Sequence, residues 1–130
     1  MKAAAFALLF LASLPARAEW IPVGEGNEIY AAYADPSTLR REGPFVRLSA
    51  LYDFKRRDQT PEGRSMYSSV VLREFDCDAR KVRLLSFIDF GGQMGQGEAV
   101  ASDAGVRHWE DIVPGALDEQ FWRFACRQGL

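Results

Sequence analysis

The sequence offers a single histidine, His108, for acid–base chemistry. A serine-type triad would need His108 beside a nucleophilic serine and an orienting acid such as Asp111, and no G-x-S-x-G turn accompanies it. His108 is instead expected to be a surface or loop residue next to Trp109. We therefore predict that the protein is not an enzyme and has no catalytic residues.

Metal chemistry has an equally thin basis. Asp76, Asp78 and Asp89 lie around a cysteine and a tight turn, but their spacing is not that of a calcium-binding loop. Isolated acids in such a context are expected to be solvated turn residues. We predict no metal site.

Haem is the alternative small ligand, because Met94, Tyr67 or His108 could supply an axial atom. Their spacing selects no pair, and a C-x-x-C-H attachment site is absent. Residues 91–97 are rich in glycine but lack the Lys-Ser or Lys-Thr of a phosphate-binding loop. That segment is expected to supply backbone freedom, with positive φ at one or more glycines. We predict no cofactor, and haem stays open as the alternative.

The strongest binding signal is a set of four basic side chains: Lys55, Arg56, Arg57 and Arg64. Residues 55–63 form the longest polar segment and are predicted to be a loop. Loops carry binding sites more often than strands do, so this set is the candidate ligand-binding site for acidic or sulfated partners. The competing interpretation is a solvated loop in which Asp58 and Glu62 partly cancel the charge.

The first 18 residues have the features of a secretory signal peptide. Lys2 precedes an apolar run at residues 3–14, and small residues precede a cleavage site between Ala18 and Glu19. The apolar run is shorter than the roughly 20 residues of a spanning helix, so no transmembrane segment is expected after cleavage. We predict export to the periplasm or to the cell surface or outer membrane, with one domain at residues 19–130.

Charge and cysteine content agree with an exported binding protein. Cleavage removes Lys2 and Arg17 from the 16 basic residues and no acids, which leaves 14 basic against 18 acidic side chains. A mildly acidic balance argues against nucleic acid as a partner. Cys77 and Cys126 are the only cysteines, and no C-x-x-C motif is present. They are expected to form one structural disulfide in an oxidising compartment.

Period-two alternation and turn residues predict a sheet of about five or six antiparallel strands: 20–23, 28–33, 46–54, 65–75, 82–90 and 98–102. Asp35 before Pro36 favours a turn or short helical bend at residues 35–39. Residues 82–90 are apolar on both faces, so they are expected to form a central strand, and 98–102 a short edge strand.

One helix is expected, after Pro114. Leu117, Phe121 and Phe124 form a stripe that would cover one face of the sheet. Cys126 is off this stripe, roughly opposite Leu117. Either the buried face is wide enough to include Trp122, or the last turn departs from helical geometry. The predicted fold is α+β, with the helix packed on one sheet face and held by the disulfide.

The predicted core consists of apolar positions that share one buried face: Val46, Leu48, Ala50, Tyr67, Val71, Phe75, Leu84, Phe121 and Phe124.

Several short segments follow one another in a characteristic order: Glu19-Trp20, Asp35-Pro36-Ser37-Thr38-Leu39-Arg40-Arg41, Leu51-Tyr52-Asp53-Phe54-Lys55, Glu74-Phe75-Asp76-Cys77, Met94-Gly95-Gln96-Gly97, residues 109–115 and Cys126. Together they resemble the surface-adhesin protein E family over nearly the whole chain after the signal peptide. The resemblance implies an antiparallel sheet with a C-terminal helix fastened to it by a disulfide. It also implies a bacterial surface protein that binds host matrix and plasma proteins of the laminin and vitronectin type.

The combined prediction is an exported, non-catalytic surface adhesin, for which a homodimer is one assembly to test. The alternative is a periplasmic binding or structural module that could bind haem. The residues alone do not separate the two.

Overall fold

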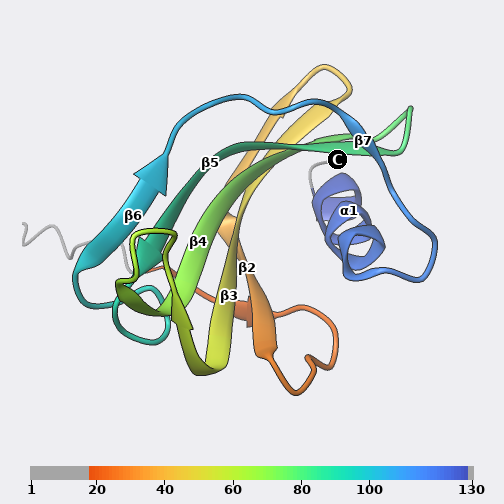
Figure 1. Ribbon diagram of the computed structural model, residues 1–130. Helices are drawn as coiled ribbons and strands as arrows, with labels where there is room; N and C mark the ends of the chain where they lie inside the picture. Colours follow the sequence, from red (N-terminus) through yellow and green to blue (C-terminus); the bar gives the residue numbers. More distant parts are fainter. Residues whose placement is uncertain (1–17, 129–130) are drawn as a thin grey trace, which may run out of the picture.

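The computed structural model describes residues 18–128, so the predicted signal peptide lies, apart from Ala18, outside the described residues. One antiparallel sheet has the strand order β1-β2-β3-β4-β5-β6, with β7 also paired to β5 (Figure 1). The elements in chain order are β1 (Ile21–Pro22), β2 (Tyr30–Glu42), β3 (Phe45–Gln59), β4 (Ser65–Asp76), β5 (Lys81–Phe90), β6 (Ala99–Asp103), β7 (Glu110–Asp111) and α1 (Leu117–Gln128). The predicted α+β fold is confirmed.

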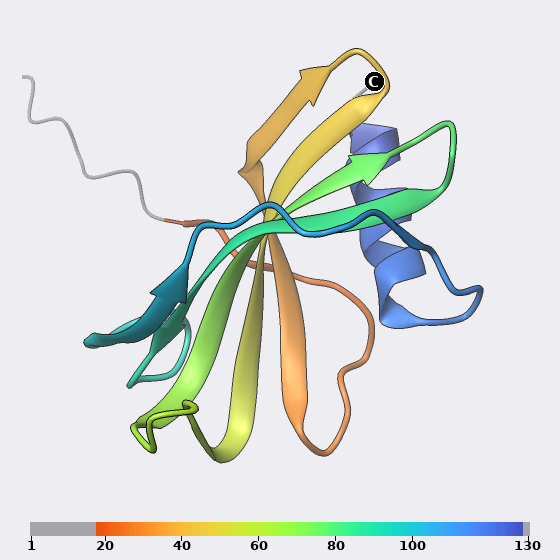
Figure 2. The same ribbon diagram turned by 45° about the horizontal axis from the view of Figure 1, so that its top comes forward.

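The edge next to β5 is shared by two short strands. β6 pairs with the last residues of β5, and β7 pairs with Lys81 and Val82 at its start. Between them, the N–H of Arg107 donates to the carbonyl of Leu84 (2.9 Å). The chain thus runs from β6 along this edge and on to α1, as both views show (Figure 2). The predictions that β5 is central and that β6 is a short edge strand are confirmed.

Residues 35–39 were predicted to form a turn or short helical bend after a strand. Instead they form an irregularity inside β2. The register with β3 shifts between positions 35 and 40. Within this bulge, the N–H and Oγ of Ser37 donate to Oδ1 of Asp35 (3.0 and 2.6 Å), and Oγ1 of Thr38 donates to the Asp35 carbonyl (2.6 Å). The local turn chemistry is therefore present. The bulge changes the direction of β2 but does not end the strand, because hydrogen-bonded pairing with β3 resumes after the bulge.

The core lies between α1 and the sheet face that it covers. Its buried members are Val23, Ala32, Ala34, Val46, Leu48, Ala50, Val71, Phe75, Val82, Ile112, Phe121 and Ala125. Leu84 and Phe124 are partly buried against this cluster. Tyr67 was predicted in the core but lies outside it, near the start of β4. A helix of twelve residues rises only about 18 Å. A strand as long as β4 extends about 40 Å, so α1 leaves part of the sheet face uncovered.

The disulfide fastens α1 to the end of β4. Cys77 and Cys126 are bonded, with their Cα atoms 5.6 Å apart. Cys126 lies within the regular helix, and Trp122 one turn earlier also packs against the core. Nε1 of Trp122 donates to the Asp76 carbonyl (3.1 Å). Of the two sequence interpretations, the wide buried face that includes Trp122 is confirmed.

The opposite sheet face has a second, smaller apolar contact. Leu51 is fully buried there, on the face of β3 opposite to that of Leu48 and Ala50. Residues 91–97 fold over it, and a Cβ atom added at Gly95 would lie 3.1 Å from Val70 and 3.7 Å from Leu51. The solvated face of β3 is therefore restricted to positions beyond this loop, such as Arg47.

Polar anchors hold residues 91–97 on the sheet. Oγ of Ser68 donates to the Gly92 carbonyl (2.6 Å) and accepts the N–H of Gly95 (2.9 Å). The N–H of Met94 donates to Oδ1 of Asp53 (2.8 Å). Positive φ at Met94, Gly95 and Gly97 confirms the predicted backbone freedom of this segment.

Candidate binding surface

Three of the four predicted binding residues lie in a strand, not in a loop. β3 continues through Lys55, Arg56 and Arg57, and the true connection to β4 is the short turn at residues 60–64. The N–H of Lys55 donates to the carbonyl of Ile29 (2.9 Å), so pairing with the chain before β2 extends the strand. The loop prediction was wrong because this backbone pairing tolerates charged side chains that point into water.

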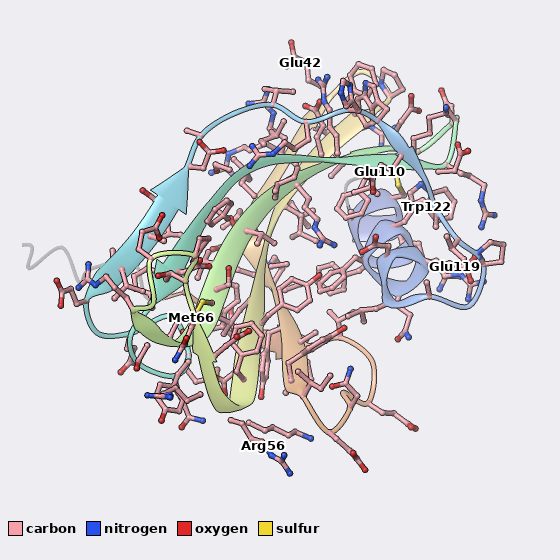
Figure 3. All side chains as sticks on the ribbon, in the orientation of Figure 1. Glu42, Arg56, Met66, Glu110, Glu119 and Trp122 are labelled. Carbon is pink, nitrogen blue, oxygen red and sulfur yellow. A yellow bond between two sulfur atoms is a disulfide. The ribbon has the colours of Figure 1, made fainter. Side chains whose placement is uncertain are left out.

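The register explains how these side chains are presented. Asp53 pairs with Ser68, whereas Asp58 pairs with Met66. Residues 54–57 of β3 therefore stand opposite only one residue of β4, and this bulge directs the basic side chains outward. Arg56 points away from the sheet at the end opposite Glu42 (Figure 3).

Apolar and basic side chains meet at this end of the sheet. We call the group formed by Ile29, Phe54, Lys55, Arg56 and Arg57 the strand-end surface. Ile29 is 63% exposed, and Ile29, Phe54, Arg56 and Arg57 line a shallow hollow of about 310 Å³ with Glu28 and Asp58. An exposed apolar contact flanked by cations is suited to an acidic protein surface or a sulfated chain.

Arg64 does not join this group. Its Nη2 atom pairs with Oε1 of Glu98 (3.0 Å), which ties the β3–β4 turn to the segment before β6. Both side chains are well exposed, so the pair is worth little stability. The four predicted residues therefore form a group of three on β3 and a separate, paired Arg64.

The structure does not bring the candidate haem ligands together. His108 lines a hollow that it shares with Arg73 and Asp118, whereas Met94 lines another one beside Trp20. Tyr67 lines neither. The side chains of His108 and Asp111 are both exposed, and exposure is what was expected of His108 beside Trp109.

The candidate metal ligands have local roles or stand apart. Oδ1 of Asp76 accepts the N–H groups of Asp78 (3.1 Å) and Ala79 (2.9 Å) and so caps the β4–β5 turn. Asp89 is buried near the end of β5. Within residues 18–128, no group of three or more His, Cys, Asp or Glu side chains is arranged to hold a metal ion.

Sequence reasoning missed a charged row across the outer sheet face. Arg47, Glu74 and Arg83 are direct cross-strand neighbours on β3, β4 and β5. Glu74 is 3% exposed; its Oε2 accepts Nε of Arg47 (2.9 Å), and its Oε1 accepts Nε (2.9 Å) and Nη2 (2.5 Å) of Arg83. Burial alone would raise the pKa of Glu74, but the hydrogen bonds and charges of Arg47 and Arg83 outweigh it and hold this pKa below its usual value.

Arg73 was also missed, although it occupies an inward position between Val71 and Phe75. It pairs with Asp118 in the first turn of α1 (2.5 Å). Its guanidinium lies 5.4 Å from the ring centroid of Tyr52 and 5.9 Å from that of Phe121. The break in the apolar alternation of β4 was the available sequence signal. The helix partner could not be read from it.

Tyr52 gives this inner cluster a testable pH dependence. Burial raises the pKa of Tyr52 to about 12, although the nearby Arg73 charge opposes the rise. The unfolded chain loses the phenol proton near pH 10, so the free energy of unfolding is unaffected below that pH and falls between about pH 10 and 12. A shift of two pKa units corresponds to about 2.7 kcal/mol. Urea denaturation at several pH values should show wild type losing up to that much relative to Tyr52→Phe, and parallel curves would contradict the assignment.

Comparison with known proteins agrees with this architecture. The sequence profile of the family described as surface-adhesin protein E matches residues 20–127. No curated protein matches the chain at a significant level. Crystal form II of Haemophilus influenzae protein E is 15% identical, with a TM-score of 0.67 over 85% of this chain and 89% of that chain. Its selenomethionine form is 16% identical, with a TM-score of 0.67 over 85% of this chain and 88% of that chain.

At such identities the structural likeness concerns the fold, whereas the profile match spans most of the sequence. Within the described residues, α1 is too short and too polar to cross a bilayer, and no other helix is present that could. The chain belongs to the surface-adhesin protein E family.

Proposed function

We propose that this chain is an exported adhesin that binds host extracellular-matrix or plasma proteins, of the laminin and vitronectin type, through the strand-end surface. Membership of a surface-adhesin family supports an exported protein at the cell surface that acts by binding. The proposed activity needs no cofactor and no catalytic group. Periplasmic retention is the competing location.

The observation that carries the proposal is the combination of exposure, apolar area and charge at the strand-end surface. Ile29 supplies exposed apolar area next to Arg56 and Arg57. Exposed cations act mainly on the encounter rate and on salt-sensitive contacts, because free charges are screened within about 10 Å at 0.1 M salt. Binding should therefore weaken with salt, and the contact with Ile29 should supply a salt-insensitive remainder.

The proposal predicts a strong effect of removing the three cations together. The variant Lys55→Ser/Arg56→Ser/Arg57→Ser should bind immobilised laminin, vitronectin or heparin more weakly than wild type, with a larger difference at 50 mM than at 500 mM salt. Its free energy of unfolding should change by less than about 0.5 kcal/mol, because the three side chains are exposed. Surface plasmon resonance across a salt titration measures the first quantity and urea denaturation the second.

A matched variant separates local contact from net charge. Arg107→Ser/Arg123→Ser/Arg127→Ser removes the same number of exposed cations elsewhere. It should bind like wild type, whereas Arg64→Ser should show a small effect because Arg64 already has Glu98 as a partner. Equal losses in the two triple variants would reject the strand-end surface as the contact.

The alternative, a periplasmic module, has its own outcome. If wild type binds none of the three partners and surface labelling of intact cells does not reach it, the adhesin proposal fails. Haemin titration followed at the Soret band then tests the haem version of that module, and light scattering tests for a homodimer.

A further inference from the structure

A second surface lies on the outer face of the sheet, near the turn between β2 and β3. Arg40 on β2 stands directly opposite Arg47 on β3, Arg47 opposite Glu74 on β4, and Glu74 opposite Arg83 on β5. Directly opposite residues share a face and have Cα atoms about 4.5–5.5 Å apart. We call these four side chains the arginine row.

The row carries more positive charge than its buried acid neutralises. The single carboxylate of Glu74 accepts hydrogen bonds from two guanidiniums: two from Arg83 and one from Arg47. Arg47 uses only Nε for Glu74, and its side chain remains 49% exposed. Arg40 donates Nη1 to the carbonyls of Ser37 (3.1 Å) and Leu39 (2.7 Å), which contribute no counter-charge. A purely structural role accounts for Arg83. For Arg47, the hydrogen bond within residues 18–128 uses Nε, and its two Nη groups have no partner among these residues.

Aromatic rings lie beside these guanidiniums. Phe45 stacks on Trp109 with ring centroids 5.4 Å apart and planes 28° apart. Arg83 lies 4.3 Å from the Trp109 ring centroid. Phe45, Arg40 and Arg47 also line a hollow of about 240 Å³. That volume is below the roughly 300–1,000 Å³ of sites for drug-sized ligands, so it suits a single ring rather than a large cofactor.

Planar guanidiniums recognise carboxylate and sulfate oxygens in a forked geometry, and a flat aromatic face suits the apolar face of a sugar ring. We propose that the arginine row, with Phe45 and Trp109, binds an acidic saccharide through its sulfate or carboxylate group. Arg47 is the principal anion contact, Arg40 the second, and Arg83 mainly holds Trp109 in place.

The surface is separate from the strand-end surface. Glu42, at the rim of the hollow, and Arg56 lie at opposite ends of the sheet (Figure 3). Glu42 is an exposed acid that would repel a bound anion. Two substitutions that each remove one charge from this hollow should therefore have opposite effects. Neutralising Arg47 should weaken binding of the anion, and neutralising Glu42 should strengthen it.

The test uses the disulfide-bonded protein labelled with ¹⁵N and four probes: a sulfated heparin disaccharide, 3′-sialyllactose, neutral lactose and inorganic sulfate. The indole N–H signal of Trp109, assigned with Trp109→Phe, should shift and saturate with one or both acidic saccharides. Lactose should leave it unchanged. A response to sialyllactose alone assigns the anion as carboxylate. Because the heparin disaccharide carries a uronate carboxylate besides its sulfates, a response to it alone shows that the carboxylate of sialic acid is not sufficient and favours sulfate.

Matched variants then decide the contact. Arg47→Gln should weaken binding about tenfold or more, as expected for loss of a charge-assisted hydrogen bond. Arg127→Gln, with the same change in net charge at an exposed position of α1 outside both surfaces, should bind like wild type. Glu42→Gln should bind severalfold more tightly. Arg40→Gln tests the row without touching Glu74, in case Arg47→Gln lowers the melting temperature.

Several results would overturn the proposal. These are no saturable response to either acidic saccharide, equal affinity for inorganic sulfate alone, equal losses in Arg47→Gln and Arg127→Gln, or weaker binding by Glu42→Gln. The Trp109 signal and Arg47→Gln report on this surface, whereas Lys55→Ser/Arg56→Ser/Arg57→Ser reports on the strand-end surface. Failure of one proposal can therefore be distinguished from failure of the other.

Discussion

Replacing Phe121 by alanine is expected to lower the free energy of unfolding by about 3–5 kcal/mol. Phe121 is 0% exposed, and its ring lies 6.1 Å from that of Tyr52 beneath α1. The substitution would leave a cavity at the centre of the helix–sheet contact and would remove one of the two rings that flank Arg73. Urea denaturation followed by circular dichroism measures the loss.

Phe124 provides a matched control, because it is the same residue type in the same helix but only partly buried. Phe124→Ala should cost less than half as much as Phe121→Ala, since less apolar surface is lost from the core. Equal losses, or a loss below about 1 kcal/mol for Phe121→Ala, would mean that α1 docks through a different face.

Removal of the disulfide is the second large effect. Cys126→Ser should lower the free energy of unfolding by about 2–4 kcal/mol, because the bond closes a loop across a sequence separation of 49 residues in the unfolded chain. The helix should nevertheless stay docked. Arg73–Asp118 (2.5 Å), Arg80–Glu119 (2.7 Å) and the hydrogen bond of Trp122 all hold α1 independently of the sulfur atoms.

Two measurements test the loss of stability and the docking of α1 separately. Urea denaturation of Cys126→Ser and of the double variant Cys77→Ser/Cys126→Ser should give the same loss, since both open the same loop. Near-ultraviolet circular dichroism should retain the tryptophan signal of wild type at low denaturant. A variant as stable as wild type would refute the loop-closure account, and a lost tryptophan signal would show that the disulfide is needed to dock α1.

The two binding proposals use the same sheet at opposite ends. The strand-end surface depends on a bulge that directs Arg56 and Arg57 outward, whereas the arginine row depends on the cross-strand pairing that aligns one residue from each of β2 to β5. The disulfide and Phe121 lie on the helix side of the sheet. Substitutions in either surface should therefore leave the stability contributed by the helix side largely unchanged, because distant sites add independently.

Where alternation was clear, local sequence was enough. Val46, Leu48 and Ala50 were predicted to share a buried face, and all three are buried. β5 was expected to be central because both of its faces are apolar, and it has neighbours on both sides. These predictions held because side-chain direction in a strand follows from the pleat alone.

At residues 35–39 and 55–59, the local preference for a turn or loop was identified correctly, but the secondary structure predicted from it was wrong. The hydrogen bonds of Asp35 favour a turn in isolation, yet pairing with β3 holds the segment within a strand. Lys55 to Arg57 have the composition of a loop, yet the backbone bond from Lys55 to Ile29 keeps them extended. In both segments, backbone pairing with a distant part of the chain outweighed local preference.

The sequence alone determined the fold class, the positions of most strands along the chain, the helix, the disulfide and the family, because these depend on periodicity, on cysteine number and on residue order. Tertiary structure decided which side chains meet. Arg47, Glu74 and Arg83 are 9 to 36 residues apart along the chain and become neighbours only when the registers of three strands are set. Arg73 and Asp118 meet only when α1 docks. Register and docking are long-range properties, and no local pattern specifies which charged residues they place together.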